Sequence, residues 1–148
     1  MHTTWVIAAD ASRARIFELE DRKISAVHTV KEFEHKQGRA HIREINTDAD
    51  GRFGSRDGQS HVSQPAVDAA QHEMDVFSKI VGDYLDKAAQ QRRYEHLWVL
   101  APPKLLGLIR QNLGKSASSL VEEEIAKDIS WFDERDIQDY LRRHATRH

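Results

Sequence analysis

The chain of 148 residues contains no cysteine, which excludes disulfide bonds, thiolate zinc sites and cysteine nucleophiles. Long hydrophobic runs are also absent, because every apolar stretch is far shorter than the roughly 20 residues that span a bilayer. The first residues show no secretory signal pattern. We therefore expect a cytoplasmic protein that does not contact membranes. The formal net charge is only -2, so charge alone gives no case for nucleic acid binding.

Hydrophobic residues make up 39% of the chain and charged residues 31%, proportions that suit one folded domain with a single core. We assign residues 1–144 to one α/β domain. Residues 145–148 are expected to form a frayed tail, as chain ends without an anchoring element do. No internal repeat divides the sequence.

Apolar patterning predicts three strands near the N-terminus. Thr4 to Asp10 is a short apolar run, Arg15 to Glu20 alternates with a period of two, and Ile24 to Phe33 supplies a third strand. The short polar turns between them predict an antiparallel meander. A short helical turn is expected from Gly38 to Ile45.

Helices and strands alternate in the second half of the chain. Apolar residues at three- and four-residue spacing predict a long helix over about Pro65 to Gln91. The apolar run from His96 to Ala101 is expected to form a buried parallel strand. A helix follows from Pro102, with Gly114 at its C′ position.

Near the C-terminus, Leu120 to Lys127 is interpreted as a fifth strand, and Ser130 to Asp133 resembles a capping box before a last helix that runs to about Arg143. The order is therefore βββαβαβα. A meander followed by right-handed β-α-β crossovers predicts a ribonuclease H-like topology, a mixed five-stranded sheet with helices on its faces. Trp5, Trp98 and Trp131 are interpreted as core or crevice residues, and stacking of one of them on a partner stays open.

A polar, glycine-rich segment from Asn46 to His61 separates the first strands from the long helix. We expect a mobile loop over about residues 34–64. A compact domain seldom keeps so long a structureless stretch unless the loop has a function. The sequence therefore directs the search for a functional site to this segment.

The sequence matches the known patterns of metal sites only in part. A two-metal nuclease would need carboxylates from several elements; Asp10 and Glu73 qualify, but the fourth strand ends Leu-Ala-Pro-Pro, without an acid. Asp10 is expected instead to accept hydrogen bonds from the backbone of Ser12 or Arg13 in a tight turn. The histidines beside the loop lack zinc-motif spacing.

A calcium loop is matched in part by Asn46, Asp48, Asp50, Gly51 and Asp57, which follow the EF-hand ligand spacing. Asparagine at the first position and aspartate at the last depart from that pattern, and no helix follows the loop. We expect no metal and no other cofactor.

Basic residues also gather around the loop. The candidates for contact with RNA phosphates are Arg39, Arg43, Arg52 and Arg56. Arginine on a glycine-rich loop suits phosphate contact, but nearby acids almost cancel this charge, and a solvated surface explains the pattern equally well. Both interpretations stay open.

A wider resemblance rests on segments that follow one another along the chain. They are Ala9-Asp10-Ala-Ser-Arg-Ala-Arg-Ile-Phe17, Asp50-Gly-Arg-Phe-Gly-Ser55, His72-Glu73, Leu97-Trp-Val-Leu-Ala-Pro-Pro-Lys-Leu-Leu-Gly107 and Glu124-Ile-Ala-Lys-Asp128. In order and spacing they resemble the bacterial host-attachment protein family, described as required for attachment to host cells. That family is similar in turn to the middle domain of archaeal and eukaryotic peptide-chain release factors, so the resemblance implies their topology.

In those release factors, a Gly-Gly-Gln loop between the third strand and the long helix enters the peptidyl-transferase centre, where the glutamine helps water attack the peptidyl-tRNA ester. Asp57-Gly58-Gln59 lies in the corresponding loop here, with Asp57 in place of the first glycine. Aspartate restricts the backbone and brings negative charge towards phosphates. The resemblance implies Gln59 and Gly58 as candidate catalytic residues.

Two functions follow as hypotheses. The first is an RNA- or ribosome-associated module of release-factor type, with the ribosome or tRNA as partner and with peptidyl-tRNA ester hydrolysis at Gln59. The second is a non-enzymatic interaction or regulatory protein that affects attachment to host cells indirectly. The sequence leaves open whether the protein is an enzyme and what its oligomeric state is.

Overall fold

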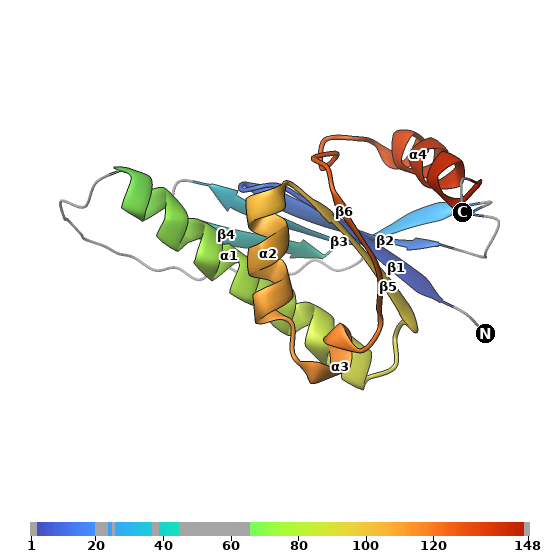
Figure 1. The fold of residues 1–148 in the computed structure, drawn as a ribbon, viewed down its shortest axis with the longest axis horizontal. Coiled ribbons are helices and arrows are strands. Elements are labelled where there is room, and N and C mark those ends of the chain that lie inside the picture. The colour runs from blue at the N-terminus through green and yellow to red at the C-terminus, as the bar shows by residue number, and fades with distance from the viewer. Residues whose placement is uncertain (1–2, 20–23, 25, 37–38, 45–65, 147–148) are drawn as a thin grey trace.

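The computed structural model describes residues 3–19, 24, 26–36, 39–44 and 66–146. Figure 1 shows their strands in one twisted sheet with helices on both sides. The elements, in chain order, are β1 (Thr4–Ala9), β2 (Arg13–Leu19), β3 (Val27–Lys36), β4 (Arg39–Glu44), α1 (Ala66–Gln90), β5 (His96–Ala101), α2 (Pro103–Asn112), α3 (Lys115–Ser118), β6 (Val121–Ala126) and α4 (Glu134–Thr146).

The described part of the sheet has six strands in the order β4-β3-β2-β1-β5-β6. Its first half is the expected antiparallel meander, in which β1 pairs with β2 and β2 with β3. Its second half is parallel, because β5 lies beside β1 and β6 beside β5. Parallel neighbours need a crossover, and helices supply it here. The predicted α/β class with a mixed sheet is confirmed, as is the strand expected near residues 120–127.

The sixth strand corrects the sequence prediction, which gives five strands and a helical turn from Gly38 to Ile45. Residues 39–44 form β4, which pairs antiparallel with β3 from Lys36↔Arg39 to Lys31↔Glu44. An isolated helical turn is costly to nucleate, whereas a neighbouring strand satisfies the backbone along the whole segment. The expected loop over residues 34–64 therefore contains a paired strand, and its later part, 45–64, lies outside the described residues.

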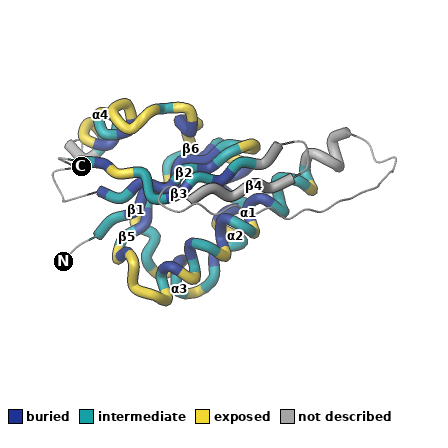
Figure 2. The backbone as a smooth tube through the Cα atoms, turned by 180° about the vertical axis from the view of Figure 1, so that it is seen from behind, coloured by how far each residue is buried: buried dark blue, intermediate teal, exposed yellow. Residues whose placement is uncertain are grey.

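The sheet separates two cores. Helices α1, α2 and α3 cover one face and α4 covers the other (Figure 1). Successive side chains of a strand point to opposite faces, so Trp5 and Ile7 of β1 pack beneath α1 and α2, while Val6 and Ala8 pack beneath α4. All of them are at most 1% exposed. Figure 2 shows this burial along the central strands.

The long helix predicted from Pro65 to Gln91 is present as α1. Phe77, Val81, Leu85 and Ala88 are buried and form the stripe that the sequence spacing predicts. No helix in the described ranges is both long enough and apolar enough to cross a membrane.

The start of α4 differs from the prediction, which placed a capping box at Ser130 to Asp133. The reciprocal bonds form three residues later. Asp133 Oδ1 accepts a hydrogen bond from the N–H of Asp136 (2.8 Å), and Asp136 Oδ2 accepts one from the N–H of Asp133 (3.4 Å). Ser130 is fully buried and bonded elsewhere, which explains why it does not cap the helix.

Candidate functional site

The residues that the sequence proposes for RNA contact and catalysis belong to β4 and to the connection from β4 to α1. Those outside the described residues are Arg52, Arg56, Gly58 and Gln59. Arg39 and Arg43 lie in β4, where their Cα positions pair with Lys36 and Glu32. Both arginines therefore belong to an edge strand that leads directly into the connection.

Asp10 follows β1 and fixes the tight turn into β2. Its Oδ1 accepts hydrogen bonds from the N–H groups of Ser12 (2.8 Å) and Arg13 (2.9 Å), so its predicted role as a turn residue is confirmed. Its Oδ2 accepts a hydrogen bond from the Ser130 hydroxyl (2.7 Å). Both carboxylate oxygens are thus used structurally. The part of the chain that the structure describes contains no cluster of three or more His, Asp or Glu side chains able to hold a metal ion.

Two arginines of β2 hold the loop that precedes α4. Arg13 Nη2 donates to the Ser130 carbonyl at 3.2 Å, and Arg15 Nη1 donates to the Phe132 carbonyl. The pKa of Arg15 is lowered by burial. The carboxylate of Glu32, which lies 3.6 Å from Arg15 Nε, offsets part of this effect. Arginine is not deprotonated in folded proteins, so the guanidinium stays charged. Two cations therefore fix the loop to the sheet.

This anchored loop exposes a tryptophan. Trp131 is 64% exposed. Among the described residues, it is the large hydrophobic side chain that is exposed to solvent. Its ring meets Phe132 edge to face, with centroids 4.6 Å apart, and Phe132 meets Tyr140 of α4 at 6.4 Å. Tyr140 in turn stacks with His144 at 6.3 Å. A row of rings thus runs from the loop along α4.

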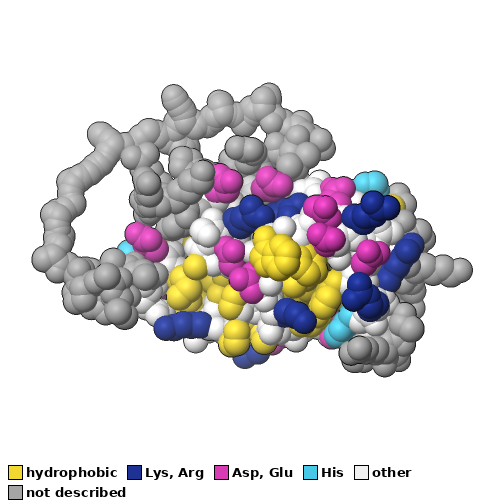
Figure 3. All heavy atoms as spheres, turned by 90° about the horizontal axis from the view of Figure 1, so that it is seen from above, with side chains coloured by type: hydrophobic (Ala, Val, Ile, Leu, Met, Phe, Trp, Pro, Cys, Tyr) yellow, Lys and Arg dark blue, Asp and Glu magenta, His cyan; other side chains and the backbone are white. Residues whose placement is uncertain are grey.

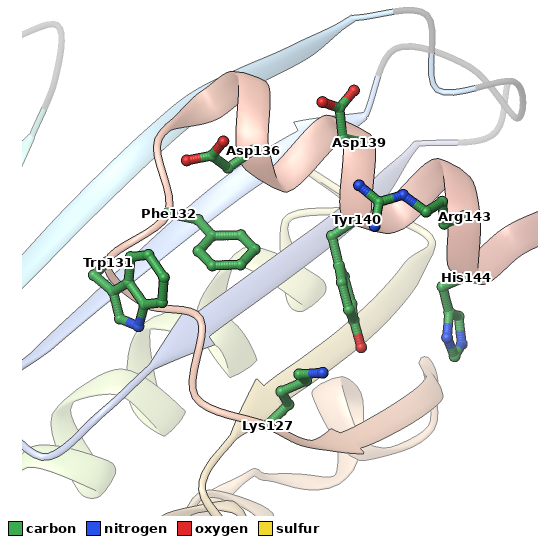
Figure 4. A pocket seen from close by; sticks show the side chains of 8 residues that line it. All are labelled: Lys127, Trp131, Phe132, Asp136, Asp139, Tyr140, Arg143 and His144. Carbon is green, nitrogen blue, oxygen red and sulfur yellow. The ribbon is translucent and has the colours of Figure 1, made fainter.

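The row of rings lines a hollow of about 560 Å³ between the loop, α4 and the end of β6 (Figure 4). The Lys127 ammonium lies 5.5 Å from the centroid of the Tyr140 ring. Asp136, Asp139 and Arg143 also line the hollow. Figure 3 shows exposed hydrophobic side chains gathered on this side of the molecule, with acidic and basic side chains around them. The arrangement suits a ligand surface that is partly aromatic or apolar and partly charged.

The sequence analysis missed this hollow. It assigned Trp5, Trp98 and Trp131 to the core or a crevice. Trp5 is a core residue (1% exposed), and Trp131 lies at the edge of a crevice, with 64% of its surface exposed. A signal existed, since Trp131 lies between a strand and the capping Asp133, outside any periodic apolar pattern. The groups that hold its loop, Arg13 and Arg15, come from the opposite end of the chain, so no local pattern reveals them.

Comparison with known sequences gives a match over most of the chain. The sequence profile of a family described as "Protein required for attachment to host cells" matches residues 5–141. An uncharacterized protein of Rickettsia prowazekii (strain Madrid E) is 44% identical over 41 residues, which make up 28% of this chain and 27% of that protein.

Comparison with solved structures concerns the fold. The archaeal translation termination factor aRF1 matches 98% of this chain with a TM-score of 0.50 and 13% sequence identity. This chain spans only 38% of the length of that factor. A structure described as an archaeal protein matches 98% of this chain and 37% of its own, with a TM-score of 0.46 and 12% identity, which is too distant to carry an argument. The release-factor-like fold expected from the sequence is confirmed, and the likeness shows nothing beyond the fold.

Proposed function

Given that this chain belongs to the family described as "Protein required for attachment to host cells", we propose that it acts as an RNA-associated module of release-factor type. The observation that carries the proposal is topological. The segment that contains Gly58 and Gln59 connects edge strand β4 to the long helix α1, in a fold shared with an archaeal translation termination factor. By resemblance, this is the connection that carries the Gly-Gly-Gln loop of release factors.

The charges that support RNA contact lie in β4 and in the connection that follows it. Arg39 and Arg43 belong to β4, and Arg52 and Arg56 follow in the connection itself. A guanidinium binds phosphate with paired hydrogen bonds. Contacts of this kind fix the position of an RNA strand without reading its sequence. We therefore propose binding that depends strongly on salt and weakly on sequence.

Catalysis is the finer part of the proposal. Gln59 orients a water molecule towards the peptidyl-tRNA ester, Gly58 gives the backbone its freedom, and no cofactor takes part. Asp57 stands where release factors have a glycine, and its charge opposes the approach to phosphates. Binding is accordingly the primary activity in this proposal, and hydrolysis is slower than in release factors.

Co-sedimentation with ribosomes over a salt series tests the binding. The test variant is Arg52→Gln/Arg56→Gln. The matched control is Lys87→Gln/Lys104→Gln, which removes the same charge at exposed positions of α1 and α2. We expect the wild type and the control to pellet with ribosomes at low salt. The test variant should bind more weakly, and its slope of log affinity against log salt should be shallower by about 1.4 if both arginines contact single-stranded phosphates.

The results separate binding from catalysis. A wild-type chain that never pellets with ribosomes, or a control that loses binding as the test variant does, would contradict the RNA proposal and leave a non-enzymatic interaction protein. Gln59→Ala is then assayed for ester hydrolysis on peptidyl-tRNA. Retained binding with lost hydrolysis supports the catalytic role, whereas unchanged hydrolysis removes it and leaves the binding proposal standing.

A further inference from the structure

We propose that the face of α4 that lines the hollow packs against the same face of a second copy of this chain, in a two-fold symmetric dimer. This face is the stripe Asp136, Asp139, Tyr140 and Arg143, whose three- and four-residue spacing places its members on one side of the helix. The inference concerns a surface other than the β4–α1 connection, so it does not depend on RNA binding.

The charge of the stripe changes sign along α4. Asp136 and Asp139 occupy its first half, and Arg143 lies in the last turn. The helix dipole explains acids in a first turn and bases in a last turn, but Asp139 lies beyond the first turn and gains little from it. Two such stripes packed antiparallel bring the acidic half of each helix against the basic end of the other. A two-fold contact makes this complementary pairing twice.

Two charged groups of the stripe are available for such a contact. Within the described residues, no hydrogen bond or ion pair engages the side chains of Asp139 and Arg143, and both residues are exposed. Arg110 shows the contrast, because its guanidinium is bound to Glu124 on β6. Figure 4 shows Asp139 pointing outwards from α4, while Tyr140 points towards Lys127.

Trp131 supplies the apolar part of the interface. Its loop is held through the Ser130 and Phe132 carbonyls, so a partner meets a preorganised side chain and little entropy is lost. Tryptophan, tyrosine and arginine are the residues that most often dominate the energy of an interface. In an antiparallel contact, the Arg143 guanidinium of the second copy approaches the Trp131 end of the stripe and can lie over the indole ring.

Single-stranded RNA also stacks on exposed aromatic rings, but it favours a positively charged groove. The lining of the hollow is mixed, with Asp136 and Asp139 beside Lys127 and Arg143. Asp128 and Asp133 flank Trp131 in sequence, and Asp136 and Asp139 line the hollow beside it. Phosphates would meet these carboxylates. The basic end of a second α4 would be attracted by them, and this difference selects a second copy as the occupant.

The expected dimer is weak. The helix has 13 residues, hence a length of about 20 Å, and an interface of one helix and a loop belongs to the small class that forms transient complexes. Analytical ultracentrifugation from about 1 µM to about 1 mM covers the affinities of that class. We expect the average mass of the wild-type chain to rise from monomer towards dimer over this range.

Charge exchange gives the decisive test. Asp139→Arg and Arg143→Asp each place like charges opposite one another in the symmetric contact, so each variant alone should remain monomeric at concentrations where the wild type dimerises. The double variant restores opposite charges and should dimerise. An equimolar mixture of the two single variants should form a heterodimer, because each copy then supplies one sign. Asp83→Arg and Lys104→Glu, at exposed positions of α1 and α2, make the same charge changes and should dimerise as the wild type does.

Circular dichroism first checks that each variant keeps its helix content. If a charge variant unfolds, Trp131→Ser replaces it and should weaken dimerisation about tenfold. A wild-type chain that stays monomeric throughout overturns the proposal. So do single variants that dimerise like the wild type, a mixture that stays monomeric, or a hollow that binds RNA oligonucleotides while the chain remains a monomer.

Discussion

The Ser130 hydroxyl donates a 2.7 Å hydrogen bond to Asp10 Oδ2, across 120 positions of sequence, and joins the β1–β2 turn to the loop that presents Trp131. The other carboxylate oxygen of Asp10 holds the turn itself through the N–H groups of Ser12 and Arg13. Ser130 is fully buried. One pair of residues therefore links the start of the chain to the geometry of the hollow.

We expect Ser130→Ala to lower the free energy of unfolding by about 1–3 kcal/mol, because a charged acceptor loses its partner. Urea denaturation measures this loss. Asp10→Ala should cost more, since it also removes the turn bonds. In the double variant the effects should fall short of additive by about 0.5–3 kcal/mol, as for residues in direct contact. Strictly additive effects would show that the two groups do not interact.

Substitution by alanine should change the stability of the fold in opposite directions at Gly82 and Gly107. A Cβ at Gly82 of α1 would lie 2.5 Å from the carbonyl oxygen of Asn112, at the end of α2, whereas a Cβ at Gly107 would meet nothing within 4 Å. We expect Gly82→Ala to destabilise the fold by about 1–3 kcal/mol through overpacking. Gly107→Ala should stabilise it by about 0.5–1 kcal/mol, because alanine suits a helix interior better. Each variant controls the other in denaturant titrations, and changes of the same sign would contradict this geometry.

How much the sequence reveals differs from element to element. The stripe of α1 and the buried run of β5 were predictable, because their own periodicity and apolar content define them. β4 was missed, although Ala40 and Ile42 alternate with polar residues as in a half-buried strand. The segment is short, and a strand at the edge of a sheet is fixed by its neighbour's backbone. The hollow beside α4 was missed for a related reason, because Arg13, Arg15 and Asp10 fix its loop from more than 110 positions away.

Gly114 lies at the predicted position after α2, but the physical reason for a glycine there differs from the predicted one. The sequence assigns it to the C′ position of α2, where glycine commonly supplies a positive φ, yet its φ is -76°. A Cβ there would lie 2.5 Å from the Asp86 carboxylate. That carboxylate accepts a hydrogen bond from the N–H of Ala117 in α3. The space is filled by a side chain from another helix, a constraint that no local pattern contains.

Arg92 ends α1 in a conformation that glycine adopts more readily. Its φ is 59°, its N–H donates to the Ala89 carbonyl, and the N–H of Arg93 donates to the Ala88 carbonyl, which together form a Schellman motif with Arg92 at C′. A left-handed residue with a Cβ is strained by about 1–2 kcal/mol, and the greater freedom of glycine in the unfolded chain offsets part of the gain. We therefore expect Arg92→Gly to stabilise the fold by about 0.5–1 kcal/mol.

Thermal and urea denaturation measure this gain. Arg92→Ala is the control, because it removes the exposed side chain but keeps the Cβ and its strain. A glycine variant no more stable than the alanine variant would show that the left-handed backbone carries no cost at this position.

Tyr94 predicts a loss of stability at alkaline pH. Its ring is 2% exposed and stacks on Trp5 at 4.7 Å, and its hydroxyl donates to the Leu85 carbonyl at 2.7 Å. Burial, together with the negative charge of Asp86, raises the pKa of Tyr94 above the ordinary tyrosine value of about 10. Above that pH the folded chain keeps a proton that the unfolded chain releases. The contribution of Tyr94 to the free energy of unfolding is therefore constant below about pH 10 and falls as the pH rises further.

The free energy of unfolding should fall by up to about 1.4 kcal/mol per pH unit from this group. Tyr94→Phe cannot ionise, so it should start about 1 kcal/mol less stable at neutral pH, where the bond to Leu85 is lost, and should then decline more gently above about pH 10. Urea titrations of both proteins at a series of pH values measure the two slopes. The remaining ionisable groups are common to both, so equal slopes would mean that Tyr94 titrates alike in the folded and unfolded chains.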